Sequence, residues 1–161
     1  GGSENGTKDL LNASFVFELH RRMFENVWRW AGKVRTSEKN IGVDPAQIQN
    51  QLAALFGDTK YWIESGTRPW DEIAAQFHHR LVQIHPFANG NGRHARLMTD
   101  LLLSSHGQPK FTWSITQDES QLVAEGPVRD DYIHALQSAD KGDLAPLIRF
   151  ARSTVPGGAK K

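Results

Sequence analysis

Apolar residues recur three and four positions apart along most of the chain, a spacing that places side chains on one face of a helix. The spacing predicts helices in six stretches: 12–30, 45–65, 69–84, 93–105, 117–136 and 143–152. Gly57 is expected to interrupt the second stretch and the Gly126-Pro127 pair to break the fifth. The pattern predicts a mainly α protein, a helical bundle of five to seven helices.

One segment departs from the helical pattern. Residues 33–43 are short, polar and rich in turn-forming side chains, which favours a small exposed β-hairpin over a helix. We call this predicted hairpin the flap. Its central residues are Val34, Arg35, Thr36, Ser37, Glu38, Lys39, Asn40 and Ile41.

Length and composition place the chain among ordinary folded proteins. Its 161 residues suit one domain, expected at 10–152, with a flexible N-terminal remnant at 1–9 and a flexible tail at 153–161. The net charge of +1 favours neither a nucleic acid nor a membrane surface as a partner. No cysteine is present, so thiol chemistry is excluded and a cytoplasmic location is expected.

A glycine-rich turn, residues 85–96, separates two of the predicted helices and reads HPFANGNGRHAR. Gly90 and Gly92 alternate with Asn89 and Asn91, residue types that permit a tightly curled backbone. A curled backbone that leads into a helix directs several N–H groups at one point, and the helix dipole adds positive charge there. The segment therefore predicts a phosphate-binding loop between two central helices.

Ionisable side chains flank this loop. Arg93 and Arg96 lie in the first turn of the following helix, where a cation opposes the dipole unless an anion is bound. His85 has the pKa range needed to accept a proton from a hydroxyl at neutral pH, so we interpret it as a general base. Phe87 is expected to turn inward and to anchor the loop in the core.

The string from His85 to Arg96 resembles the Fic family, whose pattern is H-x-F-x-(Asp/Glu)-G-N-G-R-x-x-R. Every fixed position matches except Asn89, which stands where the family usually carries an acidic residue. The resemblance extends over most of residues 14–152, including the flap region. Within the family, the HPF-x-NGNGRH form is most similar to the bacterial proteins of the mobile mystery protein B subgroup.

The resemblance implies a Fic-type fold and transfer of AMP from ATP, with Mg²⁺ on the phosphates, to a Ser, Thr or Tyr hydroxyl of a target protein or of the chain itself. His85 would deprotonate that hydroxyl. The residues implied to hold the nucleotide are Asn89, Gly90, Asn91, Gly92, Arg93 and Arg96. Gly92 stands where the kinase-like branch of the family carries lysine, which favours nucleotidyl transfer over phosphorylation.

Asn89 leaves three interpretations open. It could serve as a neutral ligand of the metal in an active enzyme, because an amide offers Mg²⁺ a carbonyl oxygen but no charge. The transferred group could differ from AMP. Alternatively, the chain could bind nucleotide with weak or no transfer and act as a regulator in a toxin or mobile-element system.

The resemblance also implies a partner for the flap and an inhibitory segment, which we call the brake. The flap would pair with the backbone of the target protein and align its hydroxyl. Many relatives are restrained by a helix with the motif (Ser/Thr)-x-x-x-Glu-(Gly/Asn), and Ser14 with Glu18 matches only its first part. The brake is therefore expected on an upstream segment or on a separate inhibitory partner, with Glu18 as the less favoured alternative.

Overall fold

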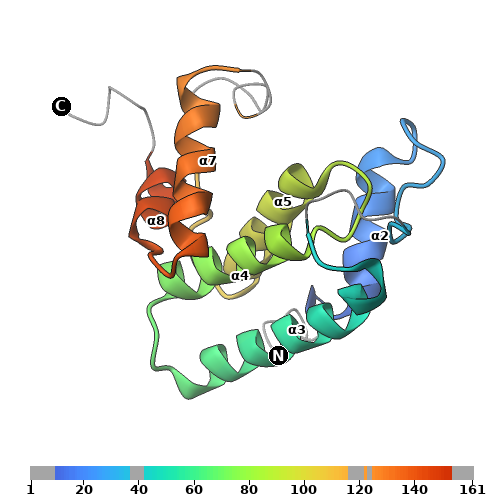
Figure 1. Cartoon of the computed structure of the whole chain (residues 1–161). Helices are drawn as coiled ribbons and strands as arrows, with labels where there is room; N and C mark the ends of the chain where they lie inside the picture. The colour runs from blue at the N-terminus through green and yellow to red at the C-terminus, as the bar shows by residue number, and fades with distance from the viewer. Residues whose placement is uncertain (1–9, 37–41, 116–121, 123–124, 154–161) are drawn as a thin grey trace. The chain divides into compact units, whose positions relative to one another are not determined.

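The computed structural model describes residues 10–36, 42–115, 122 and 125–153. In this part of the chain all regular structure is helical, and no strand occurs (Figure 1). The elements are α2 (Ala13–Phe24), the 3-10 turn η1 (Pro45–Gln47), α3 (Ile48–Ser65), α4 (Trp70–Ile84), α5 (Asn91–Ser105), α7 (Pro127–Asp140) and α8 (Ala145–Arg152). The predicted mainly α class is confirmed.

The chain forms two compact units, residues 1–109 and residues 110–161. The predicted domain at 10–152 spans both. The first unit contains α2, η1, α3, α4 and α5, and with them the whole glycine-rich loop. The second contains α7 and α8. The candidate site is therefore built by the first unit.

Helices α3 and α5 both pack against α4, and α2 packs against α3 and α5. Their apolar faces meet in one core, in which Val16, Leu52, Phe77 and Met98 have no exposed surface. These residues come from α2, α3, α4 and α5 respectively, so each helix of the first unit supplies part of the same buried cluster. Burial of this kind is the main stabilising term in a helical domain.

The first helix is shorter than the sequence pattern predicts. It ends at Phe24, whose carbonyl oxygen accepts hydrogen bonds from the amides of Val27 and Trp28, both at 2.9 Å. The turn brings the indole rings of Trp28 and Trp30 into a parallel stack, with centroids 4.5 Å apart. Trp28 and Trp30 therefore belong to a cluster of aromatic rings and not to a helical stripe, while Val27 is exposed. The spacing of apolar residues along the chain does not distinguish these outcomes.

The expected interruption at Gly57 is wrong, because α3 runs unbroken through it. A Cβ atom at Gly57 would meet nothing within 4 Å, so this position lies on an open face of the helix. A glycine inside a helix costs about 1 kcal/mol relative to alanine. Burial of Leu52, Leu55 and Phe56 on the opposite face outweighs that cost.

The flap is described only at its two ends. No strand is assigned to Val34, Arg35 or Thr36, and residues 37–41, which include Ser37, Glu38, Lys39, Asn40 and Ile41, lie outside the described residues. The β-hairpin therefore stays a prediction. Arg35, expected to be exposed with the rest of the flap, is instead only 4% exposed.

In the second unit α7 packs against α8, with the rings of Tyr132 and Phe150 5.4 Å apart. The predicted break at Gly126-Pro127 is confirmed, because α7 begins at Pro127. Asp143 was predicted to cap the last helix, but the N-cap of α8 is Leu144, one residue later. The side chain of Asp143 still contacts this helix start, because its Oδ1 atom accepts the amide of Ala145 at 3.2 Å.

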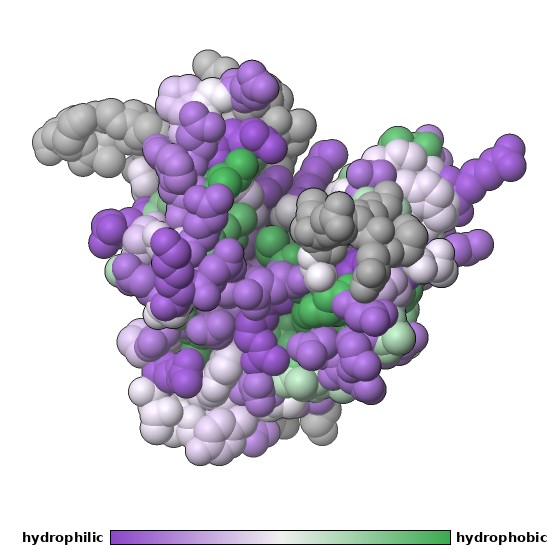
Figure 2. Space-filling view, viewed as in Figure 1, coloured by the Kyte–Doolittle hydropathy of each residue, from purple (hydrophilic) through white to green (hydrophobic). Residues whose placement is uncertain are grey.

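Hydrophilic side chains cover most of the face seen in Figure 2, and apolar side chains occupy smaller areas of it. This distribution follows from helices that each bury one face. No helix in the described part of the chain is both long enough and apolar enough to cross a lipid bilayer.

Candidate nucleotide-binding site

The glycine-rich loop joins the end of α4 to the start of α5, as the sequence predicts. His85 follows α4 directly and has a left-handed backbone, with φ 54° and ψ 62°. Gly90 is also left-handed, with φ 78°, and is the N-cap of α5. Left-handed backbone at a non-glycine residue such as His85 is uncommon and is maintained only by surrounding contacts.

The N-terminus of α5 is suited to an anion. The N–H groups of the first helical turn, at Asn91, Gly92 and Arg93, have no acceptors within the helix. The first turn contains no acidic side chain. The helix dipole places partial positive charge at the same point. The local field therefore favours a phosphate group over any neutral ligand.

Gly90 is held against two aromatic rings. A Cβ atom at this position would lie 2.7 Å from the Phe24 ring and 3.3 Å from the Trp28 ring. Phe24 of α2 and Trp28 of the turn after α2 thus pack against the loop where it enters α5. Glycine is required here both by its positive φ and by this close approach.

Phe87 lies in the core with no exposed surface, which is where an anchor of the loop must lie. Its ring meets Phe17 edge to face at 6.1 Å and stacks on the imidazole of His20 at 3.7 Å. Rings in such arrangements contribute about 0.5–1.5 kcal/mol beyond their buried area.

The side chain of Asn91 binds the backbone of Phe87 through two hydrogen bonds. Its Oδ1 atom accepts the amide of Phe87 at 2.9 Å, and its Nδ2 atom donates to the carbonyl of Phe87 at 2.7 Å. The side chain of Asn91 therefore stabilises the loop internally. Only its backbone amide is directed by the helix toward the anion position.

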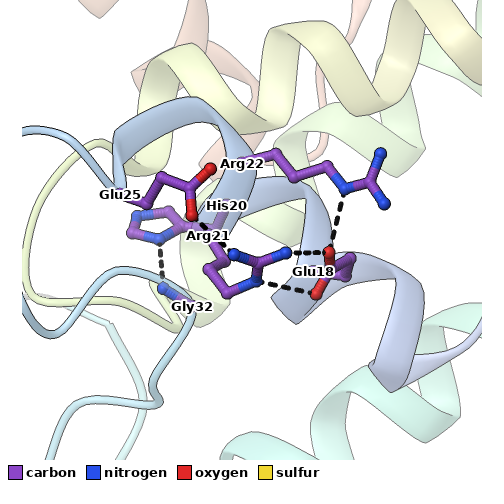
Figure 3. Close-up of polar contacts among 6 residues, drawn as sticks. All are labelled: Glu18, His20, Arg21, Arg22, Glu25 and Gly32. Atoms are coloured by element: carbon purple, nitrogen blue, oxygen red, sulfur yellow. Dashed lines mark hydrogen bonds and ion pairs between the residues drawn. The ribbon is translucent and has the colours of Figure 1, made fainter.

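His20 is a loop contact that sequence reasoning missed. Its Nδ1 atom accepts the amide of Gly32 at 2.9 Å (Figure 3). Its Nε2 atom lies 2.9 Å from the carbonyl oxygen of Asn89. Burial lowers the pKa of His20 below its usual value. The available signal was its position four residues from Val16 and from Phe24, on the buried face of the first helix.

The two loop arginines occupy different surroundings. Arg93 is exposed, with its guanidinium 5.9 Å from the centre of the Phe24 ring. Arg96 is only 4% exposed. Burial, and secondarily the positive charge of Arg96, lowers the pKa of His78 to about 3. The buried Arg96 of α5 is therefore close enough to His78 of α4 for its charge to be felt, and His78 is neutral.

Glu18 is engaged on the exposed side of α2. Its carboxylate binds the guanidinium of Arg21 and also accepts from Nε of Arg22 at 2.9 Å (Figure 3). These hydrogen bonds to Arg21 and Arg22 lower the pKa of Glu18 to about 2. The structure thus gives no support to the less favoured alternative in which Glu18 acts as the brake.

A resident metal site is not evident in the described residues, where no group of three or more His, Asp or Glu side chains could hold an ion. Asn89 is exposed. Its backbone carbonyl oxygen contacts His20, which leaves its side-chain amide oxygen as the ligand it can offer. One neutral oxygen suits a Mg²⁺ ion that arrives on nucleotide phosphates better than an ion held by the protein alone.

These features define a helical protein with a glycine-rich loop that leads into a helix N-terminus suited to an anion, and with a histidine at the edge of that loop. The family model described as "Fic/DOC family" matches residues 10–103. The chain belongs to the Fic/DOC family. It is also 34% identical over 143 residues to the protein adenylyltransferase fic-1 of Caenorhabditis briggsae, an alignment covering 84% of this chain and 25% of the relative. The chain thus spans about a quarter of the length of the curated relatives it matches.

Solved structures share the fold. A fragment of Fic-1 from Caenorhabditis elegans superposes with a TM-score of 0.69 at 28% identity, covering 95% of this chain and 47% of the fragment. A Fic-domain signalling protein from Bacteroides thetaiotaomicron gives a TM-score of 0.72 at 22% identity, covering 95% of this chain and 64% of that one. The predicted Fic-type helical fold is therefore confirmed.

Proposed function

We propose that this chain transfers AMP from ATP to a Ser, Thr or Tyr hydroxyl of a target protein, or of itself. The observation that carries the proposal is the placement of His85 at the end of α4, one short loop before the free N–H groups that open α5. The relatives named protein adenylyltransferases, at about 30% identity over most of this chain, support the same reaction.

In this reaction the N–H groups at the start of α5 hold the phosphates, and Arg93 and Arg96 supply positive charge. The target oxygen forms a bond to the α-phosphorus while the bond from that phosphorus to the bridging oxygen breaks. Pyrophosphate leaves with the electron pair, and the imidazole of His85 accepts the hydroxyl proton. Positioning and charge stabilisation suffice for such a displacement, so no covalent enzyme intermediate is needed.

Mg²⁺ belongs to this proposal as part of the Mg·ATP substrate. Asn89 is its candidate protein ligand, through the side-chain oxygen. The flap, from Val34 to Ile41, is proposed to align the target, and an inhibitory partner or segment is proposed to restrain transfer. A cytoplasmic location and membership of the bacterial mobile mystery protein B subgroup also stay predictions. The relatives reported above include proteins from nematodes, and others come from insects.

Labelling with ATP that carries a radioactive α-phosphate tests the reaction. The wild-type protein, with a cell lysate as the source of targets, is expected to yield a labelled protein band. His85→Ala is expected to abolish the label, and His134→Ala, a change at an exposed histidine of α7, is expected to retain it. The absence of wild-type labelling with ATP, GTP, UTP and CTP would contradict nucleotidyl transfer.

Asn89 by itself favours a second function, in which the chain binds nucleotide without efficient transfer. Residues 85–96 contain no acidic side chain that could replace the usual metal ligand. The chain would then bind nucleotide with weak or no transfer and act as a regulator. Calorimetric binding of Mg·ATP that is lost in Arg96→Ala, combined with no labelling of any protein, would distinguish this function from the first.

A further inference from the structure

Arg35 lies buried at the base of the predicted flap, and its guanidinium contacts the end of α4. The Nε atom donates to the carbonyl oxygen of His85, and an Nη atom donates to those of Val43 and Ile84, the latter at 3.2 Å. A guanidinium holds its donors in a rigid planar fork, so it can serve carbonyls that converge from separate segments. Arg35 thus joins three backbone positions.

Two of these carbonyls, those of Ile84 and His85, lie at the end of a helix, where donors are needed. Ile84 is the last residue of α4, and His85 follows with its left-handed backbone. The last carbonyl groups of a helix have no partners within it, and a positive charge near them is favourable. Arg35, which is 50 positions away from His85 in the sequence, therefore caps α4.

Backbone hydrogen bonds also join both ends of the flap to the turn at the end of α4. The amide of Arg35 donates to the carbonyl of Pro86 at 2.9 Å, and the amide of Val43 donates to that of Ile84 at 3.4 Å. Gly42 approaches so closely that a Cβ atom there would lie 2.5 Å from the Cβ of His85. The residues before and after the flap are thus fixed to the turn that carries His85.

We propose that Arg35 is a positioning residue, which holds His85 in its left-handed conformation and sets the imidazole in register with the flap. The inference rests on the proposed function, in which His85 accepts the target's proton and the flap aligns the target. A target aligned by the flap then meets a proton acceptor that is bonded to the same segment. Without Arg35, His85 relaxes toward common backbone angles, which redirects its side chain.

Arg35→Lys tests this role because lysine keeps the charge but replaces the fork with a single ammonium group. We expect kcat for transfer to fall roughly tenfold or more, since small misplacements of a catalytic group are costly. KM for ATP is expected to change less than about threefold, because the phosphate-binding amides are unaltered. Arg22→Lys, on the exposed face of α2, is the matched control and should behave as wild type. A wild-type kcat in Arg35→Lys would overturn the proposal.

Nuclear magnetic resonance gives a readout that is independent of transfer. The Cα and Cβ shifts of His85 are expected to indicate a left-handed residue in the wild type and to move in Arg35→Lys. If the wild type shows no transfer but these shifts move, the proposed function fails while the role of Arg35 stands. If transfer occurs and the shifts do not move, the role of Arg35 fails.

If Arg35→Lys does not fold, a hydrogen-exchange measurement on the wild-type protein still tests the proposal. The Nε–H proton of Arg35 is expected to exchange with solvent at least about tenfold more slowly than that of the exposed Arg29, because it is buried and hydrogen-bonded. Equal exchange rates for the two arginines would overturn the proposal.

Discussion

The Nε2 atom of His20 lies 2.9 Å from the backbone carbonyl oxygen of Asn89. On the other side of the ring, Nδ1 accepts the amide of Gly32. A backbone N–H can only donate, so Nδ1 must be unprotonated and Nε2 must carry the hydrogen. A neutral His20 in this tautomer therefore links the turn after α2 to the loop that precedes Gly90.

His20→Phe is expected to destabilise the protein by about 1–2 kcal/mol, because the ring stack on Phe87 is retained while the part-buried backbone groups of Gly32 and Asn89 lose their partner. Urea unfolding measures the change. His134→Phe, at an exposed histidine, should shift the free energy of unfolding by less than about 0.5 kcal/mol. Equal stability of the two variants would show that the His20 bridge contributes nothing.

Acid should destabilise the fold before its carboxylates titrate. Burial lowers the pKa of His20, and it lowers those of His78 and His94 to about 3. Each is neutral when folded but binds a proton near pH 6.5 when unfolded. Their contribution is complete above pH 6.5 and is lost as pH falls, by about 1.4 kcal/mol per pH unit for each fully buried histidine.

Urea unfolding at a series of pH values from about 7 to 5 checks this pH dependence. His94→Phe should reduce the slope by about one proton. A free energy of unfolding that stays constant over this range would be inconsistent with neutral buried histidines.

Asn91→Ala is expected to cost about 2–4 kcal/mol, since the amide and the carbonyl of Phe87 would both be left buried without a partner. Asn91→Asp retains an acceptor for the amide but places an oxygen against the carbonyl, so it should also destabilise. Asn26→Ala, at an exposed asparagine, is the control. The midpoint of thermal unfolding distinguishes these outcomes.

Two glycine-to-alanine changes should act in opposite directions. Gly90→Ala forces a side chain against Phe24 and onto a positive φ, so it should destabilise by more than about 1 kcal/mol. Gly57→Ala adds a methyl group to an open face of α3 and should stabilise by about 0.5–1 kcal/mol. A stabilising Gly90→Ala would mean that the loop does not pack on Phe24 in solution.

Asn89→Asp should increase the rate of AMP transfer at limiting Mg²⁺ and lower the Mg²⁺ concentration that gives half the maximal rate, because a carboxylate adds charge to the ligand. The main chain should not be disturbed, since His20 contacts the backbone of Asn89. Asn26→Asp controls for the added negative charge. Equal or lower activity of Asn89→Asp would contradict a ligand role for this position.

The interior helices were predictable because their signals are local. The boundaries of α4 follow from an apolar stripe that ends at the His85-Pro86 pair, and those of α5 follow from the glycine loop and Gly107. The first helix was predicted too long because Val27 lies four positions after Met23 and so continues the helical spacing beyond Phe24, where the chain instead turns and Trp28 stacks on Trp30. Spacing along the chain does not report which rings meet in space.

The sequence by itself determined the loop, because two glycines and two asparagines before a helix constrain the backbone locally and the motif identifies the family. Only the tertiary structure decided what holds that loop. His20 lies 69 positions from Asn89, and Arg35 lies 50 from His85, so these hydrogen bonds depend on how whole helices pack. Arg35 was predicted as an exposed flap residue, and it became a buried cap because the carbonyls at the end of α4 need a donor.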